Sequence, residues 1–494
     1  MCIRKPILEV EQIRDWDQYT IEKEPISSYW LMERAAQMAT AFIVNNFSKD
    51  KSVLIYAGSG NNGGDGVAIA RMLSEKGFDV HICIETFSKW SPDTQKNIQK
   101  LPRSVREIAK LEDFKYTKRS IVIDALFGSG LSRPVKGQLA ENIEGLNQKP
   151  GIKIAIDTPS GLFADQLNDQ DIIFKADYTL TFQVPKKVMT YDKSILFTGK
   201  VMVLPIGLLE NYIVEQASGE NWFLGEDIII KPRPDYGHKG TFGKVSVVGG
   251  CYGTIGAPIL AALSAFSVGA GLVALAVPKE YQTTVAAQYP HLMQLSVKGD
   301  HHMEQVQLDD KTRVVVVGPG LGVNETSKKL LKVLWKQQDV DFVVDADALN
   351  CIAKFNLSFP ENSILTPHRK EMERLLGQTF EEEDALWRET ARFAQEKNCF
   401  VILKSAHSKV FSPDGSIDHH LGGNSALAKG GSGDILAGVT GGLKAQGYTH
   451  VEAMNTAIEI QQHSARIFCK AEAPHALTPV RLVDNIGKAM KELY

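Results

Sequence analysis

Residues 424–438 read NSALAKGGSGDILAG, a glycine-rich run that leads into the apolar pattern of a helix. The glycines leave several backbone N–H groups unpaired where the helix begins, and the helix dipole adds roughly 0.3–1 kcal/mol of attraction for an anion there. Asp434 lies in the first turn, within reach of a bound anion. An aspartate at this place can simply cap a helix, but the small residues before it favour a phosphate site with an adjacent base.

Short apolar runs alternate with amphipathic segments on both sides of this stretch. Such alternation is typical of parallel sheets covered by helices, so we predict an α/β fold class in both halves. The strands expected in the second half are residues 244–248, 272–277, 313–317, 342–344, 363–365 and 400–403, and the helices are 257–268, 434–445 and 451–470. In the first half we expect strands at 52–57, 80–84, 120–125, 153–156, 178–182 and 200–204, and helices at 26–47 and 67–76.

Between the halves, residues 207–240 contain several prolines and glycines and few periodic apolar positions, which predicts a linker. We therefore expect one domain at residues 1–215 and another at 226–494. The halves share no motif, so the chain resembles a fusion of two different α/β domains.

The composition of the chain disfavours several classes of function. A net charge of −3 on 494 residues provides no field to recruit nucleic acid or an anionic membrane. The six cysteines form no CxxC pair, which fits a reducing compartment, and we expect a cytoplasmic protein. Residues 245–278 carry no charge, but glycines break this stretch into pieces shorter than the roughly 20 residues that a bilayer requires, so we expect no membrane span.

The first half has its own glycine-rich segment, GSGNNGGDG at residues 58–66, between a predicted strand and a predicted helix. This arrangement lets backbone N–H groups approach a phosphate, although a tight turn without a ligand would use the same glycines. The order of residues is not that of a dinucleotide-binding GxGxxG segment, which disfavours an ordinary dehydrogenase.

Oxygen-bearing side chains follow neighbouring strands of the first half: Asp124, Asp157 and Ser160, with Asn62 in the glycine-rich segment. Ligands bind at the carboxyl ends of parallel strands, and hard oxygens with one or two charges suit a monovalent cation. The alternative is that Asp157 and Ser160 cap a following helix.

Four motifs occur in order across about the first 210 residues: LMERA (31–35), NNGGDG (61–66), DALFGSGL (124–131) and DTPSGL (157–162). Together they resemble the NAD(P)H-hydrate epimerase domain. The resemblance implies a Rossmann-like three-layer domain that interconverts the R and S forms of hydrated NADH and NADPH, called NADHX and NADPHX.

The same resemblance implies the site residues of that domain. The hydrate site would be lined by Asn61, Asn62, Gly63, Gly64, Asp65, Gly128, Ser129, Gly130, Leu131, Ser132, Arg133 and Pro134. Asn62, Asp124 and Ser160 would hold K⁺. Asp157 would contact the substrate, and we name it as the candidate for proton transfer, because a carboxylate at the pocket floor suits that role.

A second set of motifs follows in order: HKGTFG (238–243), GAP (256–258), GPGLG (318–322), DADAL (345–349), TPH (366–368) and GSGD (431–434). This set resembles the ADP-dependent NAD(P)H-hydrate dehydratase, a ribokinase-like domain, across about residues 226–494. The implied reaction phosphorylates the hydroxyl of the S hydrate from ADP, giving AMP, and phosphate then leaves. The chemistry is sensible because hydroxide is a poor leaving group and phosphate a good one.

The resemblance places Asp434 as the base, which would deprotonate the acceptor hydroxyl. Ala257, Gly322, His368 and Asp434 would contact the hydrate. The ADP, with Mg²⁺, would contact Lys404, Ser405, Ala406, His407, Ser408 and Gly433.

Two departures from the family pattern touch these loops. Arg369-Lys370 precede Glu371 where the family usually has Pro-Gly, and Lys404 is followed by Ser-Ala-His-Ser where it usually has glycine and a threonine. The choice between ADP and ATP therefore stays open. His368 could also be purely structural, and Asp345 and Asp347 either hold Mg²⁺ through water or cap the next helix, with capping slightly favoured.

Two other classes of function compete with repair. A vitamin- or sugar-type kinase fused to a nucleotide-binding regulatory domain would share GSGD, but GPGLG, DADAL and TPH do not belong to such sugar kinases. A first half that only binds partners need not keep Asn62, Asp124, Asp157 and Ser160. We expect a homo-oligomer that acts on small molecules and binds neither nucleic acid nor membrane.

Overall fold

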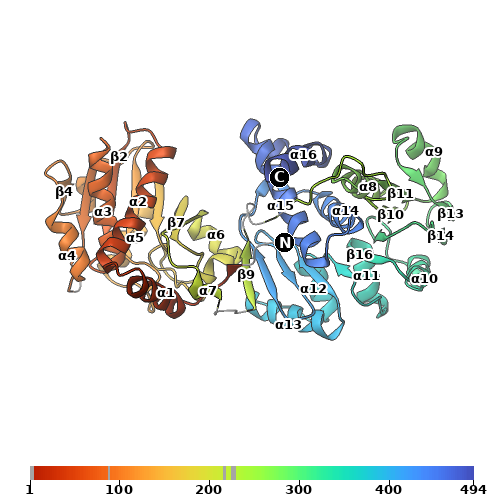
Figure 1. Cartoon of the computed structure of the whole chain (residues 1–494), viewed down its shortest axis with the longest axis horizontal. Helices are drawn as coiled ribbons and strands as arrows, with labels where there is room; N and C mark the ends of the chain where they lie inside the picture. The colour runs from red at the N-terminus through yellow and green to blue at the C-terminus, as the bar shows by residue number, and fades with distance from the viewer. Residues whose placement is uncertain (1–4, 87–88, 215–218, 224–227, 229) are drawn as a thin grey trace. The chain divides into compact units, whose positions relative to one another are not determined.

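The computed structural model describes residues 5–86, 89–214, 219–223, 228 and 230–494 (Figure 1). It divides into two compact units, one of residues Pro6–Ser218 and one of Gly219–Tyr494 with Met1–Lys5. Both units contain a mainly parallel sheet flanked by helices, so the predicted α/β fold class is confirmed.

The first unit is built on a seven-stranded sheet in the order β4-β3-β2-β5-β6-β7-β8. Its strands are β2 (Ser52–Ala57), β3 (Asp79–Ile84), β4 (Arg106–Glu107), β5 (Ile121–Ala125), β6 (Ile152–Ile156), β7 (Tyr178–Phe182) and β8 (Lys200–Leu204), and neighbouring strands in this order pair in parallel. The helices are α1 (Val10–Lys23), α2 (Ser28–Asn46), α3 (Asn61–Glu75), α4 (Pro92–Gln99), α5 (Gln138–Gln148), α6 (Ile195–Thr198) and α7 (Asn211–Val214). The order reverses between β2 and β5, which makes the carboxyl ends of these strands the expected ligand crevice.

Helix α3 begins earlier than predicted. The segment 61–66, expected as part of a loop, forms the first turns of α3, so the predicted start at residue 67 is wrong. A Cβ on Gly63 would lie 1.8 Å from the carbonyl oxygen of Gly58, and one on Gly66 would lie 2.6 Å from the Cβ of Ala125. The glycines therefore allow the helix to pack directly against the strand ends.

The second unit carries a larger sheet, in which the strands from β9 to β12 follow the order β9-β20-β19-β18-β17-β16-β15-β10-β11-β12. These are β9 (Glu220–Phe223), β10 (Lys244–Val248), β11 (Leu272–Ala276), β12 (Met293–Gln294), β15 (Val314–Val317), β16 (Asp341–Val344), β17 (Ile364–Leu365), β18 (Phe400–Leu403), β19 (Lys409–Phe411) and β20 (Ile417–His420). β1 (Lys5–Pro6) opens the described chain, and β13 (Ser296–Lys298) pairs with β14 (Gln305–Gln307).

The helices of this unit are α8 (Gly256–Ser267), α9 (Lys279–Gln288), α10 (Glu325–Leu334), α11 (Ala346–Phe355), α12 (Arg369–Leu376), α13 (Glu383–Glu396), α14 (Ser432–Ala445), α15 (His450–Ala471) and α16 (Pro479–Leu493). The six strands predicted in each half are confirmed within a residue or two. No helix among the described residues combines the length and apolarity needed to cross a bilayer.

The linker prediction is wrong for residues 220–223, because they form β9 and pair with β20. Trp222 and Phe223 are buried there. The partner strand lies about two hundred residues further along the chain, and a four-residue strand has too few positions to show a period of its own. Residues 215–218, 224–227 and 229 of the predicted linker lie outside the described part.

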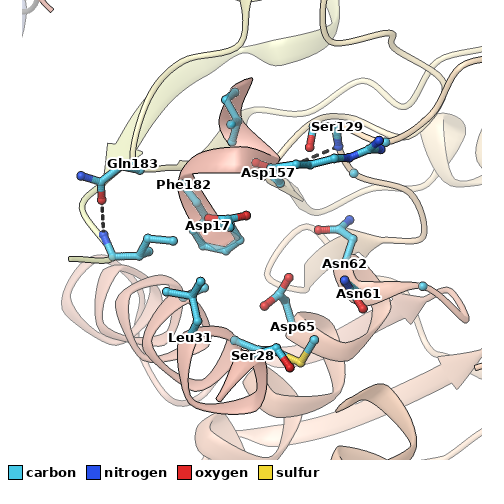
Figure 2. A pocket seen from close by; sticks show the side chains of 18 of the residues that line it. Asp17, Ser28, Leu31, Asn61, Asn62, Asp65, Ser129, Asp157, Phe182 and Gln183 are labelled. Atoms are coloured by element: carbon cyan, nitrogen blue, oxygen red, sulfur yellow. Dashed lines mark hydrogen bonds between the residues drawn. The ribbon is translucent and has the colours of Figure 1, made fainter. Parts of the chain in front are cut away.

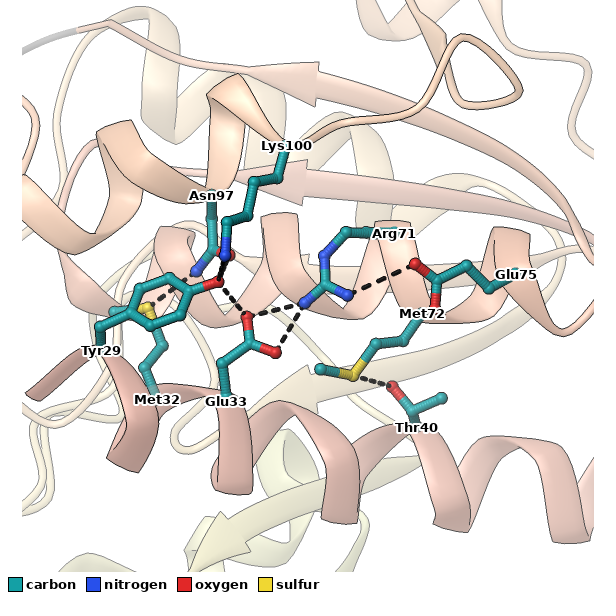
Figure 3. Close-up of polar contacts among 9 residues, drawn as sticks. All are labelled: Tyr29, Met32, Glu33, Thr40, Arg71, Met72, Glu75, Asn97 and Lys100. Atoms are coloured by element: carbon teal, nitrogen blue, oxygen red, sulfur yellow. Dashed lines mark hydrogen bonds and ion pairs between the residues drawn. The ribbon is translucent and has the colours of Figure 1, made fainter. Parts of the chain in front are cut away.

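A buried ion pair ties three helices of the first unit together (Figure 3). Arg71 on α3 donates from one nitrogen to both oxygens of Glu33 on α2, at 2.7 and 2.7 Å. Tyr29 donates to Glu33 at 2.7 Å and accepts from Lys100, just after α4, at 2.8 Å. The Glu33 side chain is only 7% exposed, so its charge depends on these partners.

We predict that Glu33→Ala loosens α2 and α3, because removing one partner of a buried pair costs about 3–5 kcal/mol. The matched control is Glu75→Ala, which removes an exposed carboxylate that also contacts Arg71, at 3.4 Å, and should cost at most about 1 kcal/mol. Hydrogen exchange measured by mass spectrometry on peptides of α2 and α3 distinguishes the two variants, because these peptides should be less protected in Glu33→Ala than in Glu75→Ala. Equal protection in both variants would contradict the structural role of the pair.

Candidate functional site

A cavity of about 870 Å³ lies in the first unit at the carboxyl ends of its strands (Figure 2). It is lined by predicted site residues from α3, the loop after β5 and the end of β6: Asn61, Asn62, Asp65, Gly128, Ser129, Gly130, Leu131, Ser132, Arg133 and Asp157. Gly63, Gly64 and Pro134 are not among its lining residues. Gly63 and Gly64 are buried and serve the close packing of α3.

Asp157 forms an ion pair on the wall of this cavity. Its Oδ1 lies 2.7 Å from the Nζ of Lys186, and its Oδ2 accepts from the backbone N–H of Ser129 at 3.0 Å. Burial would raise the pKa of Asp157, but Lys186 and the hydrogen bonds from Ser129 together outweigh burial and lower this pKa below its ordinary value. The backbone of Asp157 has φ +63°, a conformation that non-glycine residues adopt at a cost. Among the described residues no helix starts at 157–161, so the capping alternative is wrong.

Asp124 and Ser160 form a tight buried pair under the cavity. The hydroxyl of Ser160 donates to Asp124 at 2.6 Å, and its backbone N–H donates at 2.7 Å. Burial nevertheless raises the pKa of Asp124 to about 6. A cation beside this carboxylate would offset the cost of burying its charge.

Asn62 offers a side-chain oxygen that could coordinate such a cation. Its Oδ1 and Nδ2 atoms are both buried, and neither has a hydrogen-bond partner within the described ranges. A buried amide without a partner usually marks an absent ion or water. The three predicted ligands therefore fit a K⁺ ion on chemical grounds.

One side of the cavity is formed by residues that were not predicted from the sequence. Helix α1 contributes Ile13, Arg14, Asp17, Gln18 and Ile21. An acidic residue in the apolar stripe of positions 13, 17 and 21 was the available signal, because these positions share one helix face. Lys186 was also missed, although it follows the carboxyl end of β7, where ligands bind.

In the second unit, charged groups gather at the first turn of α14. A Cβ on Gly433 would lie 3.1 Å from the Nζ of Lys404, and that Nζ lies 2.8 Å from Oδ1 of Asp345 and 3.9 Å from Glu371. Asp345 is buried and also accepts from the hydroxyl of Thr366 at 2.7 Å. The structure thus brings the predicted Gly433 and Lys404 together and adds Asp345, which sequence analysis left undecided.

The charges of Asp345 and Lys404 act on Asp434. Burial raises its pKa to about 7, the charge of Asp345 adds to the shift, and Lys404 opposes it. For Lys404, burial would lower the pKa, but the charges of Asp345, Glu371 and Asp434 and the hydrogen bond to Asp345 together outweigh burial and raise this pKa. An aspartate that titrates near neutral pH is suited to act as a general base.

The remaining predicted hydrate contacts lie on loops and helix starts of this unit. Ala257 is in the first turn of α8, and the N–H of Gly322, which has φ +79°, donates to Asp347 at 2.8 Å. His368 caps α12 through its Nδ1, which accepts from the N–H of Glu371 at 3.2 Å. Its side chain is half exposed, and its Nε2 lies 3.7 Å from Oε1 of Glu371.

Capping was slightly favoured for Asp345, but this is wrong: its side chain makes no cap hydrogen bond to α11 and points to Lys404 instead.

Only some of the side chains in the loop of residues 404–408 are exposed. Ser405 and Ala406 are exposed, whereas His407 and Ser408 are buried. The Nδ1 of His407 accepts from the N–H of Gly422 at 3.2 Å, and the Ser408 hydroxyl donates to the carbonyl of Ser405 at 3.1 Å. The side chains at 407 and 408 therefore hold the loop in shape.

Comparisons with known proteins cover both units. Residues 28–188 match the family model described as YjeF-related protein N-terminus, and residues 245–488 match the one described as NAD(P)H-hydrate dehydratase. The curated bifunctional NAD(P)H-hydrate repair enzyme Nnr of Coxiella burnetii is 33% identical over 92% of this chain and 93% of its own. That of Dictyoglomus turgidum is 30% identical over 98% of each chain.

Among solved structures, an ADP/ATP-dependent NAD(P)H-hydrate dehydratase from Bacillus subtilis, co-crystallized with ATP/Mg²⁺, is similar at 25% identity and a TM-score of 0.48, over 55% of this chain and 96% of that chain. The curated relatives match almost end to end, and the two family models fall on the two units separately. The chain therefore belongs to the family of bifunctional NAD(P)H-hydrate repair enzymes.

Proposed function

We propose that this chain repairs hydrated nicotinamide nucleotides with two activities. Residues 1–215 epimerise R- and S-NAD(P)HX, and residues 226–494 dehydrate S-NAD(P)HX to NAD(P)H with ADP, giving AMP and phosphate. The observation that carries the proposal is Asp434, a half-buried carboxylate at the start of α14 whose pKa is raised to about 7, in a chain whose two units match the two family models.

In the dehydratase unit, Asp434 takes the proton of the hydrate's hydroxyl as that oxygen attacks the terminal phosphorus of ADP. The backbone N–H groups at the start of α14 and the ammonium of Lys404 stabilise the charge on the transferring phosphoryl group. Asp345 keeps Lys404 charged and in place through their 2.8 Å contact. Ala257, Gly322 and His368 are the proposed contacts to the hydrate.

Mg²⁺ is proposed to arrive with the nucleotide. Across the described residues, no group of three or more His, Cys, Asp or Glu side chains could hold a metal ion. Asp345 and Asp347 already accept hydrogen bonds from Lys404 and Gly322. Nucleotide phosphates commonly supply the missing oxygen ligands of Mg²⁺.

In the epimerase unit, Asp157 remains the proposed contact to the substrate, but its pairing with Lys186 makes it less suited to the proton transfer that the sequence suggested for it. Its charge is held by Lys186, so it is suited to stabilise positive charge that develops on the hydrated ring. Asn62, Asp124 and Ser160 are the proposed K⁺ ligands. A cytoplasmic location and a homo-oligomer stay proposals from the sequence.

One assay tests the two activities together. Purified protein is incubated with racemic NADHX, ADP, Mg²⁺ and K⁺, and the return of reduced-nicotinamide absorbance is followed. Repair predicts full conversion of both epimers. Rapid conversion of the S form alone would contradict the epimerase activity, and no conversion, with phosphorylation of a small alcohol instead, would favour a kinase.

We predict that Asp434→Asn lowers kcat/KM for dehydration of S-NADHX by about 10²–10⁴-fold, since the base is removed, and leaves epimerisation in the same molecule unchanged. In the wild type, kcat/KM should rise with pH up to about 7 and then level off, because Asp434 must lose its proton to act. A variant that dehydrates at the wild-type rate would refute the proposed base.

We also predict that K⁺ stabilises the first unit. An ion that binds only the folded state raises the free energy of unfolding in proportion to the logarithm of its concentration. Thermal unfolding of the wild type should shift upward in KCl relative to tetramethylammonium chloride at equal ionic strength, and Asp124→Asn should lose this difference. An identical shift in both proteins would contradict the assigned ligands.

A further inference from the structure

Two carboxyl groups in the cavity of the first unit have no assigned partner. Within the described residues, neither Asp17 nor Asp65 makes a side-chain hydrogen bond or a salt bridge, although both line the cavity. Figure 2 shows them facing the same space from two different helices, with Asp157 on a third segment. Both side chains are half-buried, and carboxyl groups that converge on a cavity without a protein partner are available to bind a ligand.

Helix α1 is anchored so that Asp17 faces inward. The indole N–H of Trp16 donates to the carbonyl of Leu209 at 2.8 Å, and the hydroxyl of Thr20 accepts from the N–H of Leu209 at 3.2 Å. The N–H of Val10, at the start of the helix, donates to Asp165 at 3.1 Å. These contacts fix the rotation of the helix about its axis and hold Asp17 at the cavity.

Asp65 is held equally firmly from the other side. It lies on α3, one turn after Asn61 and Asn62, and these three side chains line the cavity together. The tight packing of Gly63 and Gly66 against the strand ends leaves α3 no room to rotate. The two carboxyl groups are therefore positioned by separate, rigid elements.

We propose that Asp17 and Asp65 are the two proton-transfer residues of the epimerase, acting on opposite faces of the hydrated nicotinamide ring. This assignment rests on the proposed function and adds Asp17 to it as a catalytic residue. Inversion at a single carbon needs a proton donor on the face from which the hydroxyl leaves and a proton acceptor on the opposite face, where water adds. Two groups on different helices can provide these.

One carboxylic acid gives its proton to the hydroxyl oxygen while the C–O bond breaks, and the electron pair leaves with the oxygen as water. The lone pair of the ring nitrogen forms a C=N bond, so the ring carries one positive charge, which the Asp157 carboxylate stabilises. A water molecule adds to the opposite face, the C=N pair returns to nitrogen, and the second carboxylate takes the released proton.

The electrostatics of the cavity support this division of roles. Burial raises the pKa of Asp17 to about 6, with Lys186 opposing the shift and Asp157 adding to it. Burial, with the charges of Asp157 and Asp17, raises the pKa of Asp65 well above its ordinary value. A raised pKa makes each of these carboxyl groups easier to protonate, which favours an exchange of protons with the substrate. The other charged residues that line the cavity are Arg14, Asp93, Arg133, Asp157 and Lys186.

The test compares Asp17→Asn and Asp65→Asn with Asp15→Asn in the full chain. Asp15 is exposed on the same helix and does not line the cavity. We expect each of the first two to lower the enzymatic rate of R-to-S conversion by about 10²–10⁴-fold or to the spontaneous rate, and Asp15→Asn to leave it unchanged. Dehydration of S-NADHX by the second unit checks that each variant is intact.

The pH profile separates proton transfer from a merely structural role. In the wild type, kcat/KM for epimerisation should fall below pH about 6, because Asp17 then gains a proton and no base remains. Asp17→Glu should retain this acidic limb, and any residual rate of Asp17→Asn should lack it. An Asp17→Asn variant within about threefold of the wild type, or with the same acidic limb, would overturn the assignment.

The outcome also distinguishes this assignment from the function on which it rests. A wild-type chain that epimerises while Asp17→Asn epimerises equally well would refute only the role of Asp17. A wild-type chain that never exceeds the spontaneous rate would refute the epimerase activity itself, and the assignment with it.

Discussion

A carboxylate buried at the end of a parallel strand or at the start of a helix must find a cation or give up its charge, because desolvation penalises the ionised form. Each unit of this chain contains carboxylates of both kinds, one paired with a lysine and one with a raised pKa. Asp157 and Asp345 are paired with Lys186 and Lys404 at 2.7 and 2.8 Å. Asp65 and Asp434 have no such pair, and burial raises the pKa of each.

The paired and unpaired carboxylates divide the chemistry. A paired carboxylate stays charged and fixes the lysine beside it, so it can stabilise or position charge without exchanging protons. An unpaired one is easier to protonate, and Asp434, whose pKa is raised to about 7 by burial, can take up and release a proton near neutral pH. Both reactions proposed for this family member need the two kinds of group side by side, which explains why each site holds more carboxylates than binding alone would require.

Much of the architecture could be predicted from the sequence because the strands are short apolar runs between breakers, and because ligands of such sheets gather at strand ends. The glycine-rich turn and Asp434 could be singled out from the residues alone, whereas Lys404 and Gly433 entered the site through the family resemblance, and the closeness of the three is visible only in the fold. The start of α3 could not be predicted, since a run of glycines lowers helix propensity and only packing against the Gly58 carbonyl and the Ala125 side chain makes it favourable. Asp17 was missed because its place in the apolar stripe of α1 indicates that the residue faces inward, but not that this helix closes a cavity built from other segments.

The charge state of Asp434 tests this account most directly. Its side-chain carboxyl can be followed by ¹³C NMR in the full chain without nucleotide, with Asp434→Asn providing the assignment. The account predicts a midpoint near pH 7. A midpoint near 3.8, the ordinary value of an exposed aspartate, would show that burial does not hold the proton there and would contradict the proposed base.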